Sequence, residues 1–246
     1  KYFISRVKQD IFSGNSYLGF MTTSSIADSA HVFSVDGMTN LLENQIGIDG
    51  QIIMSSNEKI GYLGNLSYSP LGFFSTWIDY QYYETGLNFN HLGYLWRDDY
   101  KKLRTGIKFQ NQEPWSFIRS SAIILEWESE KNFEGLNLGK TIELNYDAML
   151  NNFWKIGGGY YRIQEHYDDR KIYSYYSLNE YGPAIKIPQI SGYHLNISSD
   201  KHQVISANTS WSFATNASNG IEQGQFIEVI YRPNTSLTFS GSYDNY

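Results

Sequence analysis

Long segments of this chain alternate between apolar and polar residues with a period of two. In residues 102–109, one set of alternate positions is mainly apolar, and the other set carries three positive charges, on Lys102, Arg104 and Lys108. A period of two places successive side chains on opposite faces of a β-strand. The same alternation recurs in residues 62–69, 74–82, 141–150 and 204–213. The sequence therefore predicts an all-β protein with roughly a dozen antiparallel strands.

The length of these segments favours strands that cross a bilayer. Each alternating segment runs for about 9–12 residues, close to what a tilted transmembrane strand needs, whereas globular strands average about five or six. We therefore predict an antiparallel outer-membrane β-barrel of long meandering strands, with its apolar face toward lipid. The opening residues already alternate, which predicts a fragment of a longer chain and a larger barrel.

The polar positions of the alternation favour an aqueous lumen. They hold mostly Ser, Thr, Asn, Gln and Gly with scattered charges of both signs, whereas solvent-facing sheet surfaces are usually rich in Lys and Glu. Aromatic residues make up 17% of the chain, and many lie near strand ends, as in the aromatic girdles of membrane barrels. The predicted lumen-facing residues are Asp79, Lys102, Arg104, Lys108, Glu143, Asp147 and Glu228.

A second interpretation fits the same aromatic residues. Surface Tyr and Trp side chains stack on sugar rings, so a soluble or surface carbohydrate-binding or carbohydrate-processing sandwich or propeller is the alternative. We expect a single β-barrel region over residues 1–246, with long rim loops near residues 27–40 and 164–189. The second loop contains two of the five prolines and a cluster of charges.

Composition and motifs argue against several functions. The net charge of −6 offers no basic field for nucleic acid, and the absence of cysteine excludes thiolate nucleophiles and disulfides. The run EHYDDR (residues 165–170) could bind a divalent ion or relay a proton, but a solvated loop with local ion pairs is favoured. We predict no metal site, no cofactor and no catalytic residues, and we favour a protein without enzymatic activity.

Four short motifs occur in a characteristic order: NQIGIDGQI, GLNFNHLGYLWRDDYKK, GPAIKIP and SSDKHQ. Together they resemble the C-terminal barrel region of an uncharacterised Gram-negative outer-membrane family. Full-length members of that family begin with a module similar to family-nine carbohydrate-binding domains. The matching positions are Gly47, Asp49, Gly50, Gly93, Arg97, Asp99, Gly182, Pro183, Pro188 and Asp200.

The resemblance implies an outer-membrane location but no established activity. It leaves three roles open, which are structural, transport and secretion or assembly. The partners it implies are the outer-membrane lipid bilayer and, beyond it, other envelope proteins or glycans.

Overall fold

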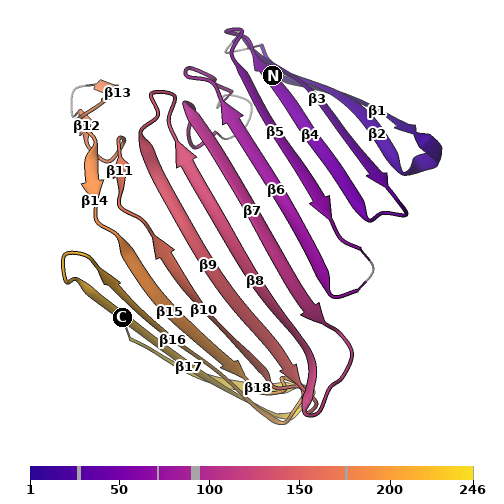
Figure 1. Cartoon of the computed structure of the whole chain (residues 1–246), viewed down its shortest axis with the longest axis vertical. Coiled ribbons are helices and arrows are strands. Elements are labelled where there is room, and N and C mark those ends of the chain that lie inside the picture. Colours follow the sequence, from indigo (N-terminus) through magenta and orange to yellow (C-terminus); the bar gives the residue numbers. More distant parts are fainter. Residues whose placement is uncertain (27–28, 71, 90–94, 175–176, 246) are drawn as a thin grey trace. The chain divides into compact units, whose positions relative to one another are not determined.

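The computed structural model describes residues 1–26, 29–70, 72–89, 95–174 and 177–245. Within these residues the prediction of an all-β antiparallel fold is confirmed. Fourteen strands form one sheet, in which each strand bonds to its neighbours along the chain, apart from a direct step from β10 to β15 (Figure 1). The regular meander follows from the alternating segments and the short turns that separate them.

The strands of this sheet are nine to fourteen residues long. Their bounds are β1 (Tyr2–Ile11), β2 (Ser16–Ser25), β3 (Ala30–Leu41), β4 (Ile46–Ser55), β5 (Ile60–Tyr68), β6 (Phe74–Tyr83), β7 (Tyr100–Asn111), β8 (Ile118–Lys131), β9 (Asn137–Leu150), β10 (Lys155–Ile163), β15 (Ile190–Ser198), β16 (Ile205–Asn216), β17 (Ile221–Asn234) and β18 (Leu237–Asn245). A short 3-10 turn, η1 (Phe12–Gly14), joins β1 to β2.

The segment between β10 and β15 lies outside the large sheet. It forms two small sheets, in which β11 (His166–Asp168) pairs with β14 (Ile185–Ile187) and β12 (Tyr173–Ser174) pairs with β13 (Ser177–Tyr181). The segment that we predicted to form a rim loop, residues 164–189, thus carries short strands of its own.

The predicted rim loop at residues 27–40 is wrong, because residues 30–41 form β3. This strand pairs with β2 from Ala30 to Thr39. The turn-forming residues in it have roles in the sheet: Asp36 accepts a hydrogen bond from Arg6, and Gly37 lies opposite Gly50. The polar face accommodates Asp36, and the apolar face accommodates the Gly37–Gly50 pair, so these residues did not signal a loop.

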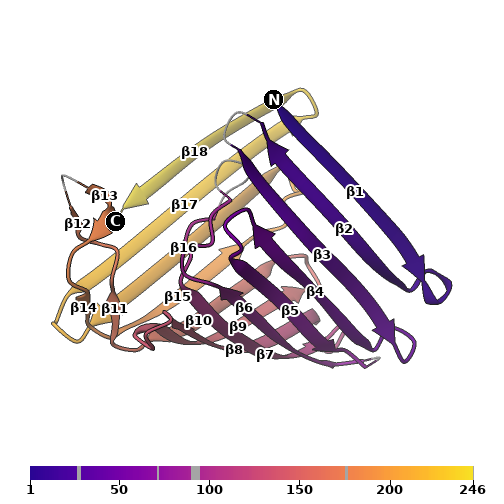
Figure 2. The same cartoon turned by 90° about the horizontal axis from the view of Figure 1, so that it is seen from above.

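The chain divides into two compact units. Unit 1 comprises Lys1–Leu71, Ser75–Gly106 and Glu128–Leu138, and unit 2 comprises Gly72–Phe74, Ile107–Trp127 and Gly139–Tyr246. Strands β1 to β5 belong to unit 1, and strands β10 to β18 belong to unit 2. Figure 2 shows β1 to β4 side by side in the first unit and β15 to β18 side by side in the second.

In unit 1 the register gathers apolar side chains on one face of the sheet. Ile48 lies opposite Leu66, and Leu66 lies opposite Ile78, so three apolar residues follow one another across neighbouring strands. Ile52 and Tyr62 form a parallel row. We call this surface the apolar face of unit 1. Its alternate positions form the polar face, with Arg6, Asp36, Asp49, Asn65 and Asp79.

Unit 2 has the same two-faced construction. Leu195 lies opposite Trp211, and Tyr193 lies opposite Phe213, on its apolar face. The alternate positions place Asn196 opposite Gly157 and Asn208 opposite Glu228, which defines the polar face of unit 2. Each face therefore follows directly from the period-two pattern of the sequence.

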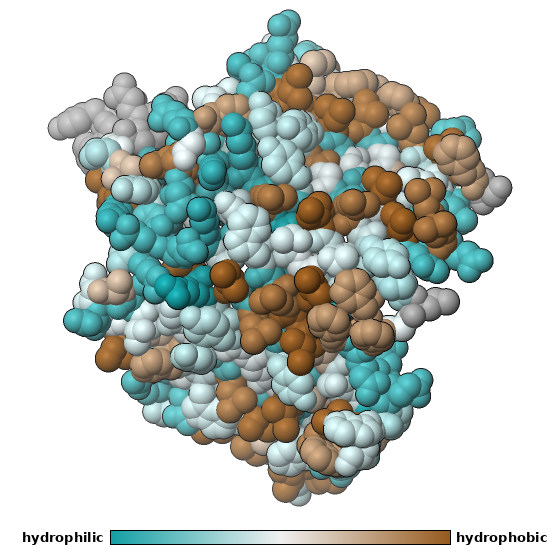
Figure 3. Space-filling model, in the orientation of Figure 1, coloured by the Kyte–Doolittle hydropathy of each residue, from teal (hydrophilic) through white to brown (hydrophobic). Residues whose placement is uncertain are grey.

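Burial is inverted relative to a soluble domain. Among the described residues, the buried hydrophobic side chains are only those of Leu87, Leu95, Tyr100, Ala148 and Ala214, while the buried polar set includes Thr23, Ser34, Ser55 and Ser206. Phe109, Leu144 and Trp211 are 48%, 44% and 38% exposed, so they do not form a dry centre between two sheets. Brown patches in Figure 3 mark hydrophobic side chains at the molecular surface. No helix within the described ranges has the length and apolarity required to span a membrane.

Candidate functional site

Charged and amide side chains on the polar face of unit 1 bond across strands. The Arg6 guanidinium lies 2.7 Å from the Asp36 carboxylate. Gly19, opposite Asp36, makes this contact possible, because a Cβ at residue 19 would lie 2.7 Å from the Asp36 Oδ1 atom. Further along the same face, the Asn65 amide donates a 2.6 Å hydrogen bond to Asp79, one of the predicted lumen-facing residues.

A denser charged cluster lies where β7 and β8 run through unit 1. The Lys102 ammonium lies 2.8 Å from a Glu128 carboxylate oxygen and 3.1 Å from Glu130 Oε1. The Tyr100 hydroxyl donates a second hydrogen bond to Glu130. Two carboxylates facing one lysine leave a net negative charge in a largely shielded place, so the cluster fixes β7 against β8 and gives the polar face an anionic patch.

Trp77 shows that Lys102 belongs to the polar face. Trp77 lies opposite Ser67 on that face, and its ring covers Gly106 so closely that a Cβ there would approach to 2.2 Å. Gly106 shares its side of β7 with Lys102 and Arg104, because all three occupy alternate positions. Asp79, Lys102 and Arg104 are thereby brought to one face.

The segment before β7 is anchored by the residues that match the GYLWRDDY motif. Arg97 is buried, and its Nε donates to the Asp99 carbonyl oxygen. The Asp99 carboxylate accepts a 2.7 Å hydrogen bond from the Phe133 amide, in the turn between β8 and β9. Asp99 also adopts a left-handed backbone (φ +56°). These two motif residues therefore fasten one segment to another, while Gly93 lies outside the described residues.

On the polar face of unit 2, glycines make room for neighbouring polar side chains. Gly157 lies opposite Asp147, and Gly159 lies between Asn145 and the His194 ring. A Cβ atom at either glycine would clash with these neighbouring side chains. Asn145 also donates a hydrogen bond to Glu143. Asp147 and Glu143 therefore lie on this face, and so does Glu228, which is opposite Asn208.

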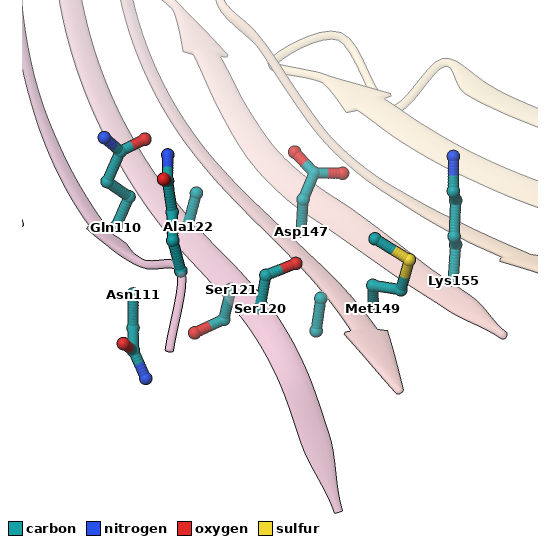
Figure 4. A pocket seen from close by; sticks show the side chains of 10 residues that line it. Gln110, Asn111, Ser120, Ser121, Ala122, Asp147, Met149 and Lys155 are labelled. Carbon is teal, nitrogen blue, oxygen red and sulfur yellow. The ribbon is translucent and has the colours of Figure 1, made fainter. Parts of the chain in front are cut away.

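Lys108 joins this face by its place on β7. It precedes Gln110 by two positions, and Figure 4 shows Gln110, Asp147 and Lys155 projecting to the same side of the sheet. Gln110, Asp147 and Lys155 line a shallow cavity of about 330 Å³ together with Ser120 and Met149. The predicted lumen-facing residues are thus divided between the polar faces of the two units.

A larger cavity of about 540 Å³ lies in unit 2 beside the turns that follow β9 and β15 and beside strand β17. Met149, Phe153 and Ile230 supply apolar walls, Lys155, Lys201 and Arg232 supply cationic groups, and His202 adds an imidazole ring. Asp200 and Glu228 are the acids of the lining. This mixture of a few polar groups and apolar walls is typical of small-molecule sites.

The turn after β15 is rigidly bonded. Asp200 accepts hydrogen bonds from the His202 amide at 2.9 Å and from the Gln203 side chain at 3.2 Å. The bond from the His202 amide is the main reason that the pKa of Asp200 is lowered from its ordinary value. Arg232 donates to the Lys201 carbonyl oxygen at 3.1 Å, and its backbone amide donates to Val204. The motif residue Asp200 is therefore committed to holding this turn.

The other motif residues lie in tight backbone positions. Gly47 leaves room for the Ser67 hydroxyl, and a Cβ atom at Gly50 would lie 3.1 Å from the Leu63 carbonyl oxygen. Asp49 lies opposite Asn65 on the neighbouring strand. Gly182 packs on Ile172, Pro183 is exposed in the loop, and Pro188 precedes β15.

The EHYDDR run shows an ion pair rather than a metal centre. Glu165 lies 2.8 Å from Lys186, and both side chains are more than half exposed. Asp168 accepts a hydrogen bond from the Arg170 amide. In the part of the chain that the structure describes, no group of three or more acidic or histidine side chains could hold a metal ion.

Comparison with known proteins places the chain in a family. The profile of a domain of unknown function (DUF5916) matches residues 2–245. The chain belongs to this family. Searches of curated proteins and of solved structures give no match.

Two parts of these sites were missed by sequence reasoning. The partners of Lys102, which are Glu128 and Glu130, stand on the next strand in the alternating run EWESE, and strand adjacency was the available signal. The cavity residues Lys155, Lys201 and Arg232 come from the start of β10, the turn after β15 and strand β17, and no local motif links them.

Proposed function

We propose that this DUF5916 chain forms part of an outer-membrane β-barrel, with its apolar faces toward lipid and its polar faces toward an enclosed aqueous space. The observation that carries this proposal is the inverted burial of the sheet. In unit 1, Ile52 and Leu66 are exposed while Ser34 and Ser55 are buried. A bilayer removes the cost of exposing the first pair to water, because lipid then covers those side chains.

Strand length and hydrogen bonding support the proposal. Strands of nine to fourteen residues are long enough to cross the hydrocarbon layer when tilted. A meander satisfies the backbone polar groups between neighbouring strands, which hydrocarbon requires.

Aromatic side chains supply a third line of support. On the apolar face of unit 1, Tyr62 stacks on Tyr82 with ring centroids 4.5 Å apart, near one end of β5 and β6. In unit 2, Phe74 and Phe109 lie 5.5 Å apart near strand ends. Amphipathic rings at strand ends are favoured where hydrocarbon meets the polar headgroups.

The role within the envelope follows from the polar faces. Lys102, Glu128 and Glu130 form a charged wall, and the cavity of unit 2 can hold a small solute. Passage or binding of small polar molecules is therefore favoured over a catalytic role, since the described residues bring no nucleophile and base together at hydrogen-bond distance in either cavity.

Site-directed labelling tests the proposal. Cysteine is absent from the chain, so single cysteines at Ile107, Lys108, Leu144 and Asn145 can each carry a spin label without background. In detergent or lipid, labels at residues 107 and 144 are expected to be accessible to a lipid-soluble relaxation agent. Labels at residues 108 and 145 are expected to respond to a water-soluble agent. The opposite pattern would overturn the proposal.

Partitioning provides a second measurement. An outer-membrane barrel is expected to need detergent for extraction and to migrate differently on a gel before and after heating. Recovery of folded protein in the soluble fraction without detergent would instead support a soluble carbohydrate-binding β-protein.

A further inference from the structure

The cavity of unit 2 has an excess of cationic groups that the protein itself leaves unpaired. Lys155 and Lys201 line it, and within the described residues neither of them forms an ion pair. Of the two acids in the lining, Asp200 is already bonded to the His202 amide and the Gln203 side chain. The three cations Lys155, Lys201 and Arg232 outnumber the two acids Asp200 and Glu228, so the lining carries a net positive charge.

The cationic groups are held by a preorganised frame. Arg232 is fixed by bonds to the Lys201 carbonyl oxygen and, at 3.4 Å, to the Ser206 hydroxyl. The Ala207 amide donates to Ser199 at 2.8 Å and closes the base of the same turn. Lys201 and His202 thus stand on a turn whose backbone is fixed before any ligand arrives, which lowers the entropic cost of binding.

The same cavity also has an apolar side. Phe153 lines the cavity, its amide donates to the Leu150 carbonyl oxygen, and the Arg119 guanidinium lies 4.9 Å from its ring centroid. Met149 and Ile230 complete the apolar side. A ligand that matches both parts carries a negative charge at one end and an apolar or planar group at the other.

We propose that this cavity binds a small organic anion with an apolar portion, such as an aromatic or aliphatic carboxylate, sulfonate or phosphate. The volume of about 540 Å³ lies within the range of known ligand sites and suits a molecule of one or two rings. The proposal needs only the geometry of unit 2, so it stands apart from the proposed membrane location.

Equilibrium dialysis with naphthalene-2-sulfonate tests this proposal on the whole chain in an uncharged detergent, after subtraction of binding to empty micelles. Saturable binding of one probe per chain is expected. The neutral analogue 2-naphthalenemethanol is expected to show no saturable binding. Inorganic sulfate is expected to bind roughly tenfold more weakly than the probe, because it loses the apolar contacts.

Matched variants assign the binding to this cavity. K155Q and K201Q are each expected to weaken probe binding about threefold, and together about tenfold, since both lysines are partly exposed to solvent. K140Q removes the same charge from β9 outside the cavity and is expected to bind like the parent chain. Circular dichroism verifies that each variant keeps its β-structure.

The outcomes separate cleanly. Absence of saturable probe binding, or equal binding by the folded K155Q/K201Q variant, overturns the proposal. Equal affinity for sulfate and the probe overturns its apolar half. Dihexanoylphosphatidylglycerol serves as a competitor: displacement that depends on both lysines assigns the natural anion to a lipid headgroup, and no displacement assigns it to a water-borne molecule.

Discussion

The polar faces of the two units are built on the same alternation but use their charges differently. In unit 1, Lys102 is held between Glu128 and Glu130, and Arg6 is held by Asp36. In unit 2, Lys155 and Asp147 form no ion pair within the described residues, and cavities of about 330 and 540 Å³ lie beside them. Paired charges make a wall that stiffens the sheet, whereas unpaired charges leave interaction capacity for a ligand.

The largest expected effect tests how tightly unit 1 is packed on its polar face. G106A places a methyl group about where the Trp77 ring now lies, so overpacking is expected to reduce the free energy of unfolding by about 2 kcal/mol. Urea unfolding of the refolded protein measures it. G64A is the matched control, because its nearest neighbour would be 3.8 Å away. Equal stability of the two variants would contradict the close packing of unit 1.

A smaller effect tests whether the charge cluster stabilises unit 1. K102Q leaves Glu128 and Glu130 facing each other without their cation, and a loss of about 1 kcal/mol in unfolding free energy is expected for these partly shielded groups. The triple variant K102Q/E128Q/E130Q removes the repulsion and is expected to recover most of that loss. K186Q, which breaks the exposed pair with Glu165, is the control and is expected to leave the urea midpoint unchanged. A K102Q variant as stable as the parent would show that the cluster is not structural.

The smallest effect concerns pH at the end of β6. The pKa of Glu84 is lowered from its ordinary value, first by the hydrogen bond from Lys59 at 3.0 Å and then by the bond from the Ile60 amide at 3.1 Å. A lowered carboxyl pKa means that the bonds persist above the ordinary pKa and are lost as the pH falls through the lowered one. The Ile60 amide resonance is expected to report that midpoint.

Removing the lysine supplies the control for this titration. K59Q is expected to move the midpoint of the Ile60 resonance to higher pH, because the chief cause of the lowered pKa is gone. A midpoint at the ordinary carboxyl value in the parent chain would show that the ion pairing of unit 1 stops at the strand ends.

Much of the fold could be predicted from alternation alone. The period of two fixed which side chains share a face, and Leu144 and Asn145 fall on opposite faces as predicted. The error was at β3, where residues 27–40 include Asp36 and Gly37, two residue types that are common in turns. Their roles depend on Arg6 and Gly50, which are distant in sequence, so the strand could not be recognised locally.

The candidate sites were only partly predictable. The period-two alternation placed Lys102, Asp147 and Glu228 on polar faces, but alternation does not say which charged side chains form ion pairs. The meeting of Lys102 with Glu128 depends on the register between β7 and β8. The cavity around Lys155 depends on turn geometry, where a left-handed Phe153 (φ +65°) brings its ring beside Arg119.

The small hydroxyl side chains buried on the polar face of unit 1 reverse the usual hierarchy of substitution. Thr23, Ser34 and Ser55 are buried, whereas Ile52 and Leu66 are exposed. Exchange of one aliphatic residue for another at the open positions changes little, since nothing there is tightly enclosed. Replacing a buried serine by a larger residue displaces its neighbours and removes the hydrogen bonds of its hydroxyl group, such as that from Ser55 to Asn57. In this protein small hydrophilic residues are therefore subject to steric limits that soluble proteins usually place on large apolar ones.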